Sequence, residues 1–196
     1  MRKYKLIGLT GTSGAGKGEV VKILASRGYS VIAADELARE IMKNEVVLEC
    51  IKNFFGADVV KDNILDRSLL AERAFYDKEH TALLNRITHP HITALFFERL
   101  TELADSGSDK IVLDAPQLFE SKINIVCDTT IAVLADEKLR LDRIIKRDKL
   151  TEQQAKQRIS VQLSDSFFTE NCDYIIYNNS TVTALTAEVE SIIGKL

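Results

Sequence analysis

The sequence predicts an α/β fold in three layers, with a parallel sheet between layers of helices. Short apolar runs at 4–9 and 30–34 flank a stretch at 19–27 whose apolar residues recur at helical spacing. Gly28 is placed to end that helix, and Asp35 follows the second run directly. Such a strand–helix–strand unit implies a parallel sheet, because its crossover is almost always right-handed.

Composition and charge exclude several classes of protein. The chain has 196 residues, of which 45% are hydrophobic and 28% charged, and no apolar run is long enough to span a membrane. The net charge of −3 provides no basic field for nucleic acid, so we expect neither a nucleic-acid nor a membrane partner. The apolar stretch at 6–9 is too short for a signal-peptide core, and we expect a cytoplasmic protein.

The chain has three cysteines, Cys50, Cys127 and Cys172, which lie far apart in the sequence. Their spacing fits neither a disulfide framework nor a CxxC metal site. We therefore expect three buried, reduced thiols.

The block at 36–106 is almost wholly helical in pattern and is the natural place for an insertion into the fold. Its clearest helices are predicted at 69–75 and 79–104. His89 precedes Pro90, and the residue before a proline disfavours helical dihedral angles. We therefore expect a break between two helices at this point.

Sheet signals return in the second half of the chain. Thr151 is expected to be the N-cap of a helix, because Glu152 lies in its first turn. In the adjacent pairs Phe96 with Phe97 and Phe167 with Phe168, one member each is expected in the core. The other predicted elements are strands at 110–114, 129–134 and 174–177 and helices at about 136–148 and 182–193.

The glycines concentrate in one loop, since five of the nine lie between Gly8 and Gly18. Glycine permits positive φ and close approach, so successive N–H groups can surround a phosphate at the start of the following helix. Lys17 adds a cation for the β- and γ-phosphates of ATP. The alternative is a glycine-rich turn that binds nothing, but the strand before it and the helix after it favour a phosphate loop. Its predicted ATP-binding residues are Gly11, Thr12, Ser13, Gly14, Ala15, Gly16, Lys17, Gly18 and Glu19.

The loop departs from the usual GxxxxGK[ST] pattern at Gly18. The missing hydroxyl normally helps to hold Mg²⁺, which we expect as the cofactor that accompanies ATP. The metal would then be held by Thr10, Thr12 or Ser13, by carboxylates, or through water. A GxGKG ending resembles adenylate-kinase-like loops and favours a small-molecule kinase over a GTPase. The predicted fold is thus a three-layer P-loop kinase fold with a helical substrate-binding insertion and a helical lid.

Further motifs follow one another along the chain. They are Val31-Ile32-Ala33-Ala34-Asp35 with Ala38 and Arg39, Asp66-Arg67 with Leu70 and Phe75, Leu84-Asn85 with Ile87, His89-Pro90 and Ile92, the turn at 113–120, Arg143 with Arg147-Asp148, Arg158-Ile159 with Gln162, and the segment 173–178. In order and spacing they resemble the dephospho-coenzyme A kinase family over most of the chain. The departures at Gly18, Ala33 and Gln117 indicate a divergent member.

The resemblance implies a phosphotransferase with an alcohol group as acceptor. Such an enzyme transfers the γ-phosphoryl group of ATP to the ribose 3′-hydroxyl of dephospho-coenzyme A, giving coenzyme A and ADP in the last step of coenzyme A biosynthesis. We expect one kinase domain over 1–196, and we assume a monomer. Its expected parts are a core at about 1–35, 108–138 and 170–196, a helical acceptor-binding insertion at about 36–107, and a lid at about 139–169.

Asp35 is the candidate catalytic base, because carboxyl ends of parallel strands are where open sheets bind ligands. It also matches the catalytic aspartate of the family. The alternative is an aspartate that caps a helix starting near Glu36. Asp114 ends another predicted strand, where it would orient metal-bound water or only cap the turn at Pro116.

The remaining candidate residues are mostly cationic. Arg140, Arg143 and Arg147 lie three to four positions apart on one helix, where they can close over ATP and bring positive charge to the transferred group. For Arg140 we expect instead an exposed basic face paired with Asp136, Glu137, Asp142 and Asp148. The resulting assignments are Asp35, Lys17 and Arg143 as catalytic; Arg147 and Asn178 as further ATP-binding residues; and Asp35, Arg39, Arg67, His89, Asp114 and Leu118 as acceptor-binding.

Two other functions compete with this interpretation. One is another nucleoside or small-molecule P-loop kinase, which Gly18 also fits, although the His89-Pro90 motif and the turn at 113–120 argue against it. The other is a nucleotide-binding protein that has lost catalysis, suggested by Gly18 and Ala33. The presence of Lys17 and Asp35 together with the arginines makes that second alternative less favourable.

Overall fold

The computed structural model describes residues 3–196, which divide into two compact units. The first unit comprises the described part of Met1–Ile32 together with Leu103–Leu196. The second unit is Ala33–Glu102. Within the described part of the chain, no helix is long and apolar enough to cross a membrane.

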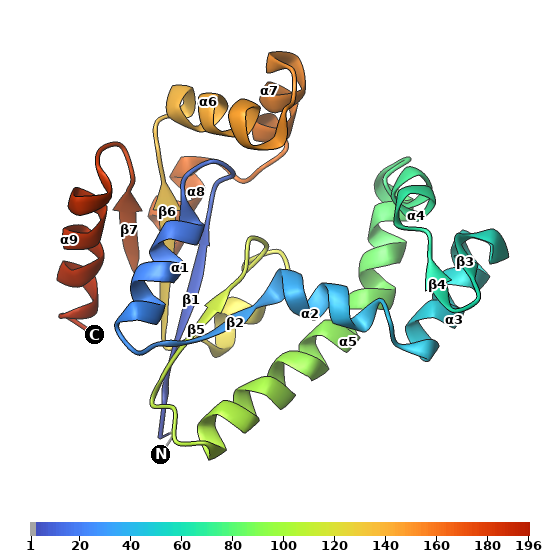
Figure 1. Ribbon diagram of the computed structural model, residues 1–196, viewed down its shortest axis with the longest axis horizontal. Helices are drawn as coiled ribbons and strands as arrows, with labels where there is room; N and C mark the ends of the chain where they lie inside the picture. Colours follow the sequence, from blue (N-terminus) through green and yellow to red (C-terminus); the bar gives the residue numbers. More distant parts are fainter. Residues whose placement is uncertain (1–2) are drawn as a thin grey trace. The chain divides into compact units, whose positions relative to one another are not determined.

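A five-stranded sheet lies at the centre of the first unit, in the order β2-β5-β1-β6-β7 (Figure 1). β1 pairs in parallel with β5 and β6, and β6 pairs in parallel with β7. Leu9 of the central strand lies opposite Asp114 on one side and Ile131 on the other. The strands are β1 (Lys5–Gly11), β2 (Ser30–Ala33), β5 (Lys110–Asp114), β6 (Thr129–Leu134) and β7 (Tyr174–Tyr177).

Helices cover both faces of this sheet, as the alternating side chains of β6 demonstrate. Ile131 and Val133 pack in a core with residues of α1 and α9, whereas Ala132 and Leu134 pack on the opposite face with Phe168 of α8. The predicted three-layer parallel fold is therefore confirmed. The helical elements are α1 (Lys17–Ser26), η2 (Ile123–Val126), α6 (Glu137–Asp148), α7 (Glu152–Ser160), α8 (Asp165–Asn171) and α9 (Val182–Ile193).

The predicted N-cap at Thr151 is confirmed. Its hydroxyl accepts the Gln154 N–H at 3.3 Å, and the Gln154 carboxamide oxygen accepts the Thr151 N–H at 2.9 Å. This reciprocal arrangement is a capping box, which satisfies two backbone donors that the first turn leaves free.

The second unit has a core of its own, formed mainly by α3, α4 and α5. The expectation of an almost wholly helical block is wrong at one point, because Asp62 and Asn63 adopt positive φ and join two short antiparallel strands. The elements are α2 (Ala34–Ile41), α3 (Glu45–Phe55), η1 (Ala57–Val59), β3 (Val60–Lys61), β4 (Ile64–Leu65), α4 (Arg67–Ala74) and α5 (Lys78–Asp105).

The predicted break at His89 and Pro90 is also wrong, since α5 continues through Pro90. Proline removes the hydrogen bond to the carbonyl four residues earlier, here that of Arg86. Both Arg86 and Pro90 are exposed, so the helix carries its missing hydrogen bond on the face that water can reach. Buried Leu84 and Phe96 lie on either side of the proline, and burial of both is compatible with one continuous helix.

Candidate active site

The loop between β1 and α1 has the backbone that its glycines predicted. Gly11, Gly14 and Gly16 have φ values of 143°, 80° and 95°, which other residues adopt at a cost. Neighbouring backbone leaves no room for side chains there. A Cβ on Gly11 would lie 2.2 Å from the Val133 oxygen, and one on Gly14 would lie 2.7 Å from the Arg140 oxygen.

Side chains from two distant elements hold this loop from behind. The Asn178 amide, at the end of β7, donates to the Ala15 carbonyl at 2.8 Å. Arg143 of α6 donates to the Gly14 carbonyl at 3.2 Å and to the Asn178 carbonyl at 3.1 Å. The guanidinium of Arg143, predicted to act on the transferred group, is thus engaged with backbone carbonyls in this structure.

Lys17, the first residue of α1, forms an ion pair with Asp114 at the end of β5. The two side chains are 16% and 21% exposed, so the pair is largely shielded at the carboxyl edge of the sheet, where parallel sheets bind ligands. Neither of the two roles considered for Asp114 included this contact. Phosphate groups bound by the loop would compete with Asp114 for the same ammonium group.

The residues around the loop could supply one or two ligands to a Mg²⁺ ion whose other ligands are phosphate oxygens of ATP and water. In the described residues, no group of three or more His, Cys, Asp or Glu side chains is arranged to bind a metal. Thr10 uses its hydroxyl proton on the Pro116 carbonyl at 3.2 Å, and the buried Thr12 hydroxyl has no partner among the described residues. Mg²⁺ commonly takes one or two protein ligands together with phosphate oxygens and water. Asp114 and the hydroxyl groups of Thr10 and Thr12 can supply these one or two protein ligands.

Arg140 differs from its prediction, because it is buried and is 6% exposed. Its guanidinium lies 3.6 Å from Asp165 of α8, and its Nε has no hydrogen-bond partner among the described residues. The expectation of an exposed basic face paired with nearby acids is therefore wrong for this residue. Its backbone also lies against Gly14, so the position supports the loop.

Arg147 is exposed and forms a two-pronged ion pair with Asp148, at 2.8 Å for each contact. Asp148 also accepts from Arg158 of α7 at 2.8 Å. The hydrogen bonds from Arg147 hold the pKa of the Asp148 carboxyl below its ordinary value, with Arg158 adding a smaller electrostatic contribution. This carboxylate therefore ties α6 to α7.

Gln162, which follows α7, also contacts the loop, although sequence reasoning assigned it no role. Its carboxamide oxygen accepts the Ser13 N–H at 3.0 Å. No spacing pattern indicates this contact, because the two residues are 149 positions apart.

A family model described as dephospho-CoA kinase matches residues 5–184 of this chain. The chain belongs to the dephospho-CoA kinase family. It is 36% identical over 192 residues to a dephospho-CoA kinase of Corynebacterium glutamicum, and the match covers 97% of this chain and 96% of the relative. It is 37% identical over 187 residues to one of Fusobacterium nucleatum, with coverage of 94% and 95%.

The structure also resembles a crystal structure of a Thermus thermophilus protein, with a TM-score of 0.86, 27% identity and coverage of 98% of both chains. Membership of the family makes the chain a kinase with an alcohol acceptor, a transferase of coenzyme A biosynthesis. The resemblance inferred from the sequence motifs is therefore confirmed.

The residues assigned to the acceptor lie partly in the second unit. Asp35 is the second residue of α2 and exposed, and Arg39 follows one turn later. The N-cap of α2 is Ala33, so the alternative role of Asp35 as a helix cap is wrong. Arg67 begins α4, and partly buried His89 lies within α5. The roles of these four residues in this family member stay predictions.

Leu118, also assigned to the acceptor, belongs to the first unit and is fully buried. A Cβ on Gly8 would lie 2.8 Å from the Leu118 side chain, so Leu118 packs against β1.

The three cysteines are free, as expected, but they are only partly buried. Burial raises the pKa of the Cys172 thiol to about 11. Of the phenylalanine pairs, Phe96 and Phe168 are the core members, as expected.

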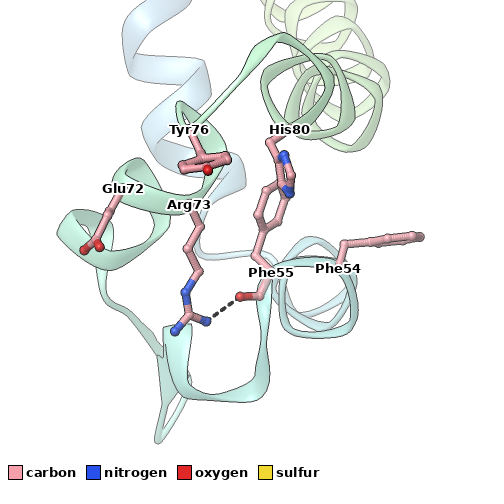
Figure 2. Close-up of a pocket in the computed structure, with 6 residues that line it drawn as sticks. All are labelled: Phe54, Phe55, Glu72, Arg73, Tyr76 and His80. Carbon is pink, nitrogen blue, oxygen red and sulfur yellow. Dashed lines mark hydrogen bonds between the residues drawn. The ribbon is translucent and has the colours of Figure 1, made fainter.

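A pocket of about 260 Å³ opens in the second unit (Figure 2). Figure 2 shows Arg73 donating to the Phe55 carbonyl, and the same guanidinium forms two contacts of 2.7 and 2.6 Å with Asp58. Its charge is thus already compensated. None of the predicted site residues lines the pocket, whose walls are Phe54, Phe55, Glu72, Arg73, Tyr76 and His80.

Proposed function

We propose that this family member transfers the γ-phosphoryl group of ATP to the ribose 3′-hydroxyl of dephospho-coenzyme A, giving coenzyme A and ADP. The observation that carries the proposal is the shaped phosphate loop, with Lys17 at its end, in a chain that matches the family over 5–184. Phosphoryl transfer needs little covalent chemistry from the protein, so positioning and charge compensation account for most of the rate.

The loop is proposed to bind the β-phosphate through backbone N–H groups at the start of α1. These donors and the helix dipole attract an anion, and Lys17 is close enough in sequence to reach the β- and γ-phosphates. If the ion pair with Asp114 opened, the Lys17 ammonium group could move with the negative charge that develops on the β,γ-bridging oxygen of ATP. Mg²⁺, when bound with ATP, compensates further negative charge on the phosphates.

Asp35 is the proposed general base. Its carboxylate accepts the proton of the ribose 3′-hydroxyl while the oxygen of that hydroxyl forms a bond to the γ-phosphorus. The bond between the γ-phosphorus and the β,γ-bridging oxygen breaks, and ADP leaves with the electron pair. Arg39, Arg67 and His89 are proposed to bind the acceptor. Arg143 is proposed to bring positive charge to the transferred phosphoryl group, and Arg147 is proposed to bind ATP.

The test is a coupled ADP-release assay with magnesium ATP and a panel of acceptors. The panel contains dephospho-coenzyme A, AMP, adenosine, no acceptor, and coenzyme A itself, whose 3′ position is already phosphorylated. We expect ADP release only with dephospho-coenzyme A. ADP release with AMP or adenosine instead would show that the acceptor is a different nucleotide or nucleoside. No ADP release from protein that binds ATP would favour a family member without kinase activity.

A further inference from the structure

Asn178 is a buried polar residue whose side chain faces the phosphate loop. It follows β7 and is 8% exposed. Its backbone N–H donates to the Leu134 carbonyl at 2.8 Å, which anchors it to β6. Its side-chain amide donates to the Ala15 carbonyl at 2.8 Å, across 163 positions of sequence.

This hydrogen bond determines the orientation of one peptide group. The described chain has no cis peptide bond, and in a trans peptide the C=O and N–H point in opposite directions. Because the Ala15 carbonyl points toward Asn178, the Gly16 N–H of the same peptide points away from it. That N–H donates to no residue that the structure describes, so it is available to an anion.

The contact between Asn178 and the loop is close. A Cβ on Gly16 would lie 2.2 Å from the Asn178 amide nitrogen, so the side chain fills the space directly behind this peptide. Arg143 reinforces the arrangement, because it donates to the Asn178 carbonyl at 3.1 Å and also approaches the Ala15 carbonyl at 3.4 Å. These hydrogen bonds from Asn178 and Arg143 hold the loop in the shape described.

We propose that Asn178 is a positioning residue for the phosphate loop. It orients the Ala15–Gly16 peptide so that its N–H faces the phosphate, and it acts on ATP through the loop without touching the adenine. The inference rests on the proposed function, because it concerns the same ATP site. It replaces a direct ATP contact as the role of Asn178.

The experiment compares Asn178→Asp, Asn178→Ala and Asn178→Ser with wild-type protein by calorimetric titration. The ligands are ATP, inorganic tripolyphosphate and adenosine. Asp has the same shape as Asn but presents an acceptor to the Ala15 carbonyl, Ala presents nothing, and Ser keeps a hydroxyl donor. Matched controls are Asn179→Asp and Asn179→Ala, at the neighbouring asparagine that does not contact the loop. The Asn179 carboxamide oxygen accepts the N–H of exposed Asp136 at 2.8 Å, and its amide donates to the Asp136 carboxylate at 2.8 Å.

We expect the affinities for ATP and tripolyphosphate to fall by about tenfold or more in Asn178→Ala, further in Asn178→Asp and least in Asn178→Ser, since the Ala15 carbonyl loses its shorter hydrogen bond and keeps only the 3.4 Å contact with Arg143. Adenosine affinity should stay within about twofold of wild type, and the Asn179 variants should bind all three ligands normally. In turnover, KM for ATP should rise more than kcat falls. A merely structural defect would lower adenosine binding equally.

Two outcomes would overturn the inference. One is wild-type affinity for tripolyphosphate in all three Asn178 variants. The other is loss of adenosine affinity with tripolyphosphate unaffected, which would make Asn178 a contact to the base. If the Asn178→Asp protein fails to fold, the relative tripolyphosphate affinities of Asn178→Ala and Asn178→Ser still test the inference. Wild-type protein that binds tripolyphosphate but phosphorylates no acceptor would contradict the proposed function and leave this comparison valid.

Discussion

Two glycines at the start of α1, only two positions apart, have opposite environments. Gly16 has φ of 95° and faces the Asn178 amide, so both its backbone and its surroundings exclude a side chain. Gly18 lies in the first turn of α1, and a Cβ there would meet nothing within 4 Å. Backbone geometry therefore explains the glycine at 16 but does not explain the one at 18.

This difference predicts contrasting alanine variants. Gly16→Ala should abolish ATP binding, because the loop must move to relieve both the strain and the contact. Gly18→Ala should bind ATP normally and gain about 1 kcal/mol of unfolding free energy, the usual advantage of alanine over glycine in a helix. Thermal denaturation and ATP titration of both proteins provide the measurement. Normal ATP binding by Gly16→Ala would contradict the described loop geometry.

Substitutions of the proposed base and of the proposed phosphate-binding lysine should have different effects. Asp35→Asn should lower kcat by roughly 10²–10⁴ while ATP affinity is retained, because only proton transfer is lost. Glu36→Gln, on the next exposed residue of α2, is the matched control and should be active. Steady-state kinetics with magnesium ATP distinguish these variants, and unchanged turnover in Asp35→Asn would remove Asp35 as base.

Lys17→Ala should lose both ATP affinity and turnover. Its ammonium group is the charge that the phosphates attract, and Asp114 would remain without its partner beside the bound anion. Direct titration with ATP followed by the ADP-release assay measures both effects. Full activity in this variant would be incompatible with the phosphate loop as the ATP site.

At the scale of elements, α6 and α7 are joined by the carboxylate of Asp148, which bridges Arg147 and Arg158. Arg147 is also a predicted ATP-binding residue, and its ion pair would have to open or rearrange if it bound phosphate. The capping box at Thr151 starts α7 independently of these charges. The ion pairs of Asp148 thus connect the end of α6 to α7.

The Asp148 bridge predicts a dependence of stability on pH. The pKa of this carboxyl is lowered in the folded protein, so its stabilisation is present above the unfolded value of about 3.9 and is lost as pH falls through the folded value. Asp148→Asn should therefore melt slightly below wild type near neutral pH, and the difference should vanish in acid. Asp142→Asn, on the same helix, is the control. The measurement is the melting temperature of each variant as a function of pH. The same pH dependence in Asp148→Asn and Asp142→Asn would contradict a stabilising role for the Asp148 ion pairs.

At the scale of the whole molecule, two compact units each have their own hydrophobic core. Leu24 is fully buried in the core of the first unit, and Ile51 is fully buried in that of the second. The phosphate loop lies in the first unit, whereas Asp35 and Arg39 lie in the second. The phosphate loop and the proposed base Asp35 therefore belong to units whose cores can be weakened separately.

Ile51→Ala and Leu24→Ala should each cost about 2–5 kcal/mol of stability, the usual range for removing such side chains from a core. ATP should still raise the melting temperature of the first unit in Ile51→Ala, because the phosphate loop packs on the other core. Calorimetry with and without magnesium ATP should therefore resolve an early, ATP-insensitive transition in Ile51→Ala only. A single transition that shifts as a whole with ATP would show that the units unfold together.

The sequence by itself determined the local features of this enzyme. Glycine spacing and Lys17 predicted the loop, apolar runs predicted the strands, and Thr151 predicted a helix start, because each signal lies within a few residues of the structure it specifies. The local signal at Pro90 misled, because the long α5 carries this proline on its exposed face, where water can reach the free carbonyl.

Tertiary structure alone decided which distant residues meet. The pair of Lys17 with Asp114 spans 97 positions, and the bond of Asn178 to Ala15 spans 163. Both depend on the strand order β2-β5-β1-β6-β7, which brings the ends of β5 and β7 to the same edge as the loop. The burial of Arg140 likewise depends on α8 packing beside it. Periodicity and spacing carry no information about such contacts, since they report only what neighbouring residues do.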